Sequence, residues 1–170
     1  MKKTGFWLIY LLLLVAQLLL STYANFTPYV MVTLLPVMVL CIPIRVGTTL
    51  AMLIAFASGL AVDALSEGIL GINALALVPV AFARFGIIRL IFGGELFARE
   101  EDFSVHRSGF WKVAIAVVLS TALFLLVYIW ADGAGTRPLL FNALRFAGSL
   151  AASTALSFLA IDPLAPDSRK

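Results

Sequence analysis

The chain carries few charged residues for its length. Of its 170 residues, 12% are charged and 62% are hydrophobic, whereas soluble domains average about 25% charged and roughly 45–50% apolar residues. A soluble protein of this size could not bury so much apolar surface, so we interpret the chain as an integral membrane protein. The formal net charge of +3 is informative only through the loops that carry it. We expect contact with membrane lipid and none with nucleic acid.

The residue types from which most catalytic and metal sites are built are scarce. A single cysteine, Cys41, excludes an intrachain disulfide, and its apolar neighbours favour a small core residue. The single histidine, His106, lies in a charged loop, so a zinc site of the usual kind and intramembrane Ser/His catalysis are both excluded. No span offers a pair of aspartates, and no phosphate-binding glycine loop is present. We therefore expect no enzyme activity, no cofactor and no metal.

Long apolar runs are what the chain has in abundance. A spanning helix needs about 20 mostly apolar residues, and such runs predict an all-α integral membrane protein with six transmembrane helices in a single bundle. The second run is short and contains Pro36, and the first imitates a signal peptide that we expect to stay uncleaved. The predicted spans, within one polytopic membrane domain over residues 1–170, are 5–21, 28–42, 46–62, 69–88, 110–130 and 139–161.

The basic residues orient these spans. If the N-terminus is cytoplasmic, ten basic residues lie on the cytoplasmic side (inside) and only Arg137 lies on the outer side. Membrane proteins show this excess of Lys and Arg in their cytoplasmic loops. Trp and Tyr residues at both predicted interfaces agree with this topology. We therefore predict a multi-pass protein with both termini cytoplasmic, whose cytoplasmic loop 92–109 is either a solvated connector or a docking surface for a cytosolic partner. The ten inside residues are Lys2, Lys3, Arg45, Arg84, Arg89, Arg99, Arg107, Lys112, Arg169 and Lys170.

Small residues recur every four positions in two of the predicted spans, and this spacing places them on one face of a helix. Helices in lipid associate by close backbone packing, which small residues permit. We therefore predict that both faces are packing surfaces, either against each other within the bundle or against a partner. The two faces consist of Ala51, Ala55, Gly59 and Asp63 in the third span, and of Ala143, Ala147, Ala151 and Ala155 in the sixth.

Two charged residues occupy unusual positions. Asp63 ends the small-residue face of the third span, and Arg145 lies within the sixth span, about 9 Å below its start at about 1.5 Å per residue. A charge at that depth costs on the order of a few kcal/mol unless it is paired or reaches the surface. Arg145 can therefore pair with Asp63, Glu67 or Asp132, or extend to the outer surface. Asp63 can cap the turn that follows, pair with Arg145, or contact a partner protein.

The stretch FASGLAVDALSEGILGINAL, residues 56–75, resembles the rod shape-determining protein MreD family. The family pattern is an aromatic residue, Gly-Leu, an aspartate three residues later, Leu-Gly, and an Ala-Leu pair. The chain length and the proline in the second span are also similar to the family. We expect the glycines to let the third and fourth helices approach closely. The matching residues are Phe56, Gly59, Leu60, Asp63, Leu70, Gly71, Ala74 and Leu75.

The resemblance implies a non-enzymatic membrane component of the bacterial cell-elongation (rod-shape) machinery in the inner membrane. MreD-like proteins associate with the bitopic scaffold MreC and, through it, connect the actin-like MreB to peptidoglycan synthases. The resemblance also implies a fold like the substrate-binding S components of energy-coupling-factor transporters. The alternative function is therefore a vitamin-uptake S component. Such subunits usually carry an Ala-x-x-x-Ala pattern in the first span, which here reads LIYLLLLVAQLLL and lacks it.

Overall fold

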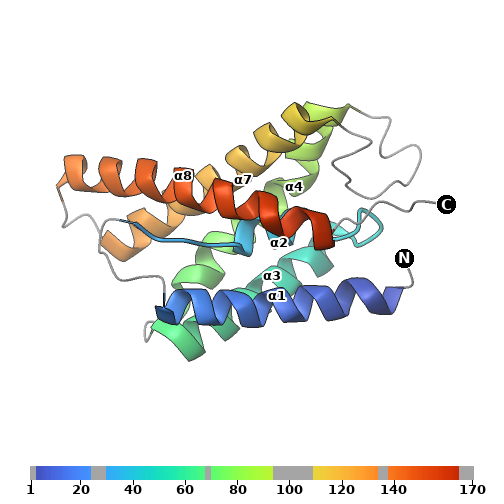
Figure 1. The fold of residues 1–170 in the computed structure, drawn as a ribbon, viewed down its shortest axis with the longest axis horizontal. Helices are drawn as coiled ribbons and strands as arrows, with labels where there is room; N and C mark the ends of the chain where they lie inside the picture. Colours follow the sequence, from blue (N-terminus) through green and yellow to red (C-terminus); the bar gives the residue numbers. More distant parts are fainter. Residues whose placement is uncertain (1–2, 24–29, 68–69, 94–108, 134–137, 165–170) are drawn as a thin grey trace.

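The computed structural model describes residues 3–23, 30–67, 70–93, 109–133 and 138–164, and it is helical throughout these ranges apart from short connections. Within them, five helices are long and apolar enough to cross a membrane. α1 begins and α8 ends at the same end of the molecule (Figure 1). The five long helices are α1 (Lys3–Tyr23), α3 (Thr48–Val62, extended by the following turn), α4 (Ile72–Phe92), α7 (Phe110–Gly133) and α8 (Leu139–Leu164).

The segment predicted as the second span does not form a long helix. Residues 30–33 are extended, and α2 (Leu35–Leu40) has only six residues, which is about 9 Å at 1.5 Å per residue. Pro36 is tolerated in the first turn of α2, but a proline disfavours helical backbone before it. Val30, Val32 and Thr33 are β-branched and favour extended backbone. The prediction of a helix over residues 28–42 is therefore wrong.

The extended segment (residues 30–33) and α2 run between α1 and α8 (Figure 1), and every residue of α2 is buried. Arg84 of α4 binds the turn that follows α2, where carbonyl groups have no helical partner. Its Nη1 donates to the carbonyl of Ile42 at 3.0 Å, and its Nη2 donates to the carbonyls of Pro43 and Val46 at 3.3 Å each. Arg84, which the sequence analysis counted among the ten inside residues, is fully buried.

Small residues allow α3 and α4 to pack backbone against backbone. Ala51 and Ala55 are fully buried, and Gly59 lies against the start of α4. A Cβ built on Gly59 would lie 2.6 Å from the Cα and from the N atom of Ala74. The small-residue face of the third span is therefore a packing surface, and the helix that it meets is α4.

The alanine face of α8 does not pack within the described chain. Ala143 and Ala147 are exposed, as are Ala151 and Ala155. The prediction that this face packs against the third span is therefore wrong, and contact with a partner is the alternative that stays open. The physical reason is that another face of α8 carries three buried serines at positions 149, 153 and 157. This serine face turns toward the extended segment, whose backbone needs hydrogen-bond acceptors.

Candidate functional site

The motif of residues 56–75 forms a compact turn between two spans. A π-helical turn, Asp63–Glu67, continues α3, and Gly71 precedes the first residue of α4. Gly71 has a φ of +101°, a conformation that is strained for residues with a Cβ. This explains why a glycine stands at position 71, whereas residues 68–69 of the same turn lie outside the described ranges.

The carboxylate of Asp63 is fully buried and satisfies the first N–H groups of α4. Its Oδ2 accepts hydrogen bonds from the backbone N–H of Gly71 (2.9 Å) and of Ala74 (3.3 Å). Its Oδ1 accepts from the backbone N–H of Asn73 (3.1 Å) and from the Asn73 side-chain Nδ2 (2.9 Å). These backbone groups have no partner inside the helix, and the helix dipole stabilises a negative charge beside them. Among the roles predicted for Asp63, the structure shows the cap.

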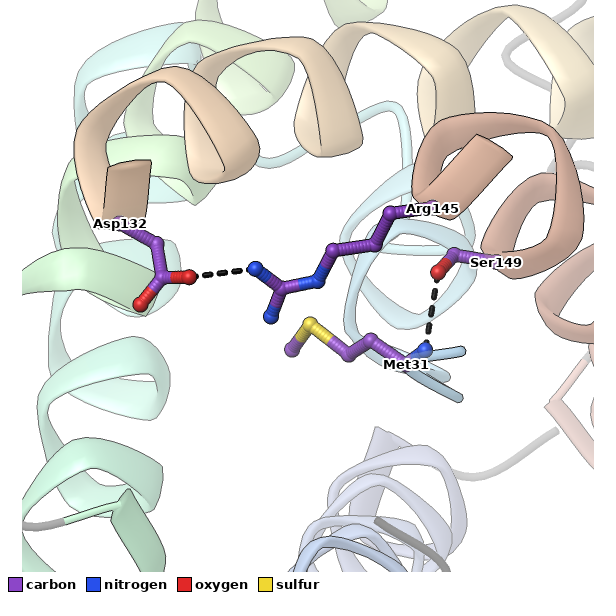
Figure 2. Close-up of polar contacts among 4 residues, drawn as sticks. All are labelled: Met31, Asp132, Arg145 and Ser149. Atoms are coloured by element: carbon purple, nitrogen blue, oxygen red, sulfur yellow. Dashed lines mark hydrogen bonds and ion pairs between the residues drawn. The ribbon is translucent and has the colours of Figure 1, made fainter. Parts of the chain in front are cut away.

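Arg145 pairs with Asp132 rather than with Asp63 (Figure 2). Its Nη1 donates to Asp132 Oδ2, which joins the end of α7 to the first turns of α8. The guanidinium also lies 5.9 Å from the centroid of the Tyr128 ring. The side chains of Arg145 and Asp132 are 12% and 16% exposed, so the rest of the chain does not cover the pair completely. The Asp132 alternative is confirmed, and the pairing of Arg145 with Asp63 is wrong.

We expect Arg145→Gln and Asp132→Asn each to lower the thermal stability of the purified protein, because each removes one charge of a partly buried ion pair. The double variant should recover part of the loss. The coupling free energy between contacting residues in a double-mutant cycle is about 0.5–3 kcal/mol. Because this pair is partly exposed, we expect a coupling free energy of about 1 kcal/mol. As a control, Arg145→Gln combined with Asp63→Asn should show additive losses. A coupling to Asp63 as large as the coupling to Asp132 would contradict the observed pairing.

A second set of polar groups holds the extended segment against α8. The backbone N–H of Met31 donates to Ser149 Oγ at 2.8 Å (Figure 2), and that of Thr33 donates to Ser153 Oγ at 3.0 Å. Ser153 Oγ also donates to the carbonyl of Met31 at 3.3 Å. Four helical residues rise about 6.0 Å and two extended residues about 6.6 Å. Serines spaced by four residues therefore match alternate N–H groups of the segment.

Gln17 of α1 binds the same stretch of chain from another helix. Its Oε1 accepts from the N–H of Leu34 at 2.7 Å, and its Nε2 donates to Ser21 Oγ at 3.0 Å. The Gln17 side chain is fully buried in a leucine-rich helix. Neither Gln17 nor the serine face was identified from the sequence. The signals were present, as a lone amide in the run AQLLL and as serines at positions 149, 153 and 157.

These polar groups cap a helix, join two helices and bind the extended backbone, so their role is structural. Among the described residues, no group of three or more His, Cys, Asp or Glu residues could hold a metal ion. The loop 92–109 lies almost entirely outside the described ranges, and so does His106. Comparison of the chain with protein-family models, with curated proteins and with solved structures finds no match in any of the three.

Proposed function

We propose that the chain is a non-enzymatic membrane subunit of the bacterial cell-elongation machinery, similar to MreD proteins. In this role it binds MreC and thereby links MreB to peptidoglycan synthesis, in the inner membrane and with both termini cytoplasmic. The observation that carries the proposal is the turn that contains the MreD-like pattern. Within it, Gly59 touches the backbone of Ala74, and Asp63 binds the N–H groups of Gly71 and Ala74. Four residues of the MreD-like pattern therefore contact one another in the structure: Gly59, Asp63, Gly71 and Ala74.

We assign MreC binding to the alanine face of α8. Exposed positions of a spanning helix that contact only lipid usually carry large apolar side chains, as Leu8, Leu11 and Leu12 do on α1. The alanine face is exposed at four positions spaced by four residues. Small side chains there let a second helix approach closely enough for backbone-to-backbone packing. This face therefore suits the spanning helix of a bitopic partner such as MreC.

We expect Ala147→Leu to weaken the capture of tagged MreC from membranes about tenfold, which corresponds to about 1.4 kcal/mol. The larger side chain holds the two helices apart, and overpacking of this kind typically costs about 1–3 kcal/mol. Because Ala147 is exposed in the chain, the thermal stability of the purified variant should equal that of the wild type. The two measurements are co-purification and thermal denaturation of the same preparations.

Ala57→Leu is the matched control, since Ala57 is also an exposed alanine in a spanning helix, α3, but lies off the alanine face. This variant should keep both MreC capture and stability. If the wild-type chain fails to retain MreC, the proposed function is wrong. If Ala147→Leu captures MreC as well as the wild type does, the function stands and the assignment of the α8 surface is wrong.

A further inference from the structure

Along most of its length, α8 is buried only at serines. Between Leu139 and Leu159, the buried positions are those of the serine face, at 149, 153 and 157. Phe146 and Leu150 pack against the core beside this face but are only half-buried. In lipid, no hydrophobic force drives apolar side chains to turn toward the bundle. Apolar side chains therefore give this part of α8 only a weak preference for one rotation about its axis.

Hydrogen bonds to the extended segment set the rotation of α8 instead. Ser149 accepts from the N–H of Met31 at 2.8 Å (Figure 2), and Ser153 accepts from the N–H of Thr33 at 3.0 Å. A backbone N–H without an acceptor is costly in a membrane. A turn of α8 about its axis would take both acceptors away together, so the two serines oppose any other rotation.

The same rotation decides which way the alanine face points. Positions offset by two residues lie about 200° apart around a helix, so the serine face and the alanine face are on nearly opposite sides of α8. The Arg145–Asp132 pair ties only the first turns of α8 to α7. Ser149 and Ser153 lie about 6 and 12 Å further along the helix, at about 1.5 Å per residue. They therefore control the part of the alanine face that lies deeper in the membrane.

We propose that Ser149 and Ser153 are positioning residues for partner binding: they hold the serine face on the extended segment and thereby keep the alanine face turned toward MreC. This inference rests on the proposed function, which assigns the alanine face to MreC. Both serines are fully buried, so they act on the partner only through the orientation of α8. The extended segment inside the bundle is in this way linked to binding at the surface.

Capture of tagged MreC from membranes tests the proposal. Ser149→Ala combined with Ser153→Ala should weaken capture roughly fivefold, because a helix that is no longer held presents the alanine face for only part of the time. Each single variant should show a smaller loss of the same kind, and the single variants carry the test if the double variant does not fold. Wild-type capture by the serine variants would overturn the proposal.

Ser58→Ala is the matched control. It makes the same chemical change at another buried serine, whose hydroxyl is hydrogen-bonded to the Tyr10 hydroxyl at 3.2 Å and joins α3 to α1. Its thermal stability should fall about as much as that of Ser153→Ala, whereas its capture of MreC should equal that of the wild type. Equal losses of capture in Ser58→Ala and Ser153→Ala would mean general destabilisation and would overturn the proposal.

The oxygen accessibility of a nitroxide label reports the orientation of α8 in nanodiscs without MreC. On a Cys41→Ala background, which removes the lone thiol, a label at Ala151 should meet more lipid-dissolved oxygen than one at Ala152. Position 151 is exposed and position 152 is half-buried, at nearly the same depth. The serine variants should lose this difference, and Ser58→Ala should keep it.

An unchanged difference in the serine variants would overturn the positioning role, whatever happens to capture. A wild-type chain that does not retain MreC would overturn the proposed function and this inference with it. Loss of capture in Ala147→Leu but not in the serine variants would leave the proposed function standing and contradict the positioning role alone.

Discussion

Gly59→Ala is expected to destabilise the protein by about 3 kcal/mol or more, at the upper end of the usual cost of overpacking. The added Cβ would lie 2.6 Å from the Cα and from the N atom of Ala74, and 2.9 Å from the carbonyl carbon of Asn73. All three are backbone atoms, so no side-chain rotation can relieve the clash. The helices α3 and α4 must separate, and this separation moves Asp63 away from the N–H groups that it caps.

Gly86→Ala is the matched control for this effect. Gly86 also lies within a spanning helix, α4, but a Cβ built there meets nothing within 4 Å. Alanine is favoured over glycine inside a helix by about 1 kcal/mol, so this variant should be as stable as the wild type or slightly more stable. Folded yield and thermal denaturation in one detergent compare the two variants. Wild-type stability of Gly59→Ala would contradict the backbone contact between α3 and α4.

The long helices are predictable because a chain segment in the membrane must satisfy its own backbone hydrogen bonds. An apolar run of about 20 residues has few alternatives to a helix in lipid, and five of the six predicted segments contain such helices. The stretch around Pro36 is different, since its extended backbone is stabilised by partners far away in the chain. Ser149 lies 118 residues from Met31, and Gln17 lies 17 residues from Leu34. Local propensity indicates the break in the helix, but only the tertiary structure supplies these acceptors.

The spacing of small residues predicts a helix face and not the neighbour of that face. Gly59 meets α4 because the turn that follows is short and Asp63 fixes the start of α4. On α8, the serines at 149, 153 and 157 are offset by two residues from Ala147, Ala151 and Ala155, and only one of the two faces can turn inward. Hydrogen bonds to the extended segment select the serines. For Arg145, depth alone predicts an acidic partner, whereas geometry selects Asp132 among three candidates.

Asp63→Asn is expected to destabilise the fold by about 3 kcal/mol or more, although it changes few atoms. Both carboxylate oxygens accept hydrogen bonds, from the N–H groups of Gly71, Asn73 and Ala74 and from the Asn73 side chain. An amide keeps one acceptor oxygen and turns two N–H donors toward groups that are themselves donors. Each buried donor left without an acceptor costs about 1–3 kcal/mol. The loss of charge also removes the favourable interaction with the α4 dipole.

Asp132→Asn is the control for Asp63→Asn, because it makes the same chemical change at a carboxylate that is partly exposed. Its loss of stability should be smaller, at about 1 kcal/mol. Amide exchange localises the effect: the Gly71 and Ala74 amides should exchange faster in Asp63→Asn and be unchanged in Asp132→Asn. Because Asp63 is fully buried, the fraction of Asp63→Asn that folds should still capture MreC. Wild-type stability combined with lost capture would contradict the capping role and would place Asp63 in the interface with the partner.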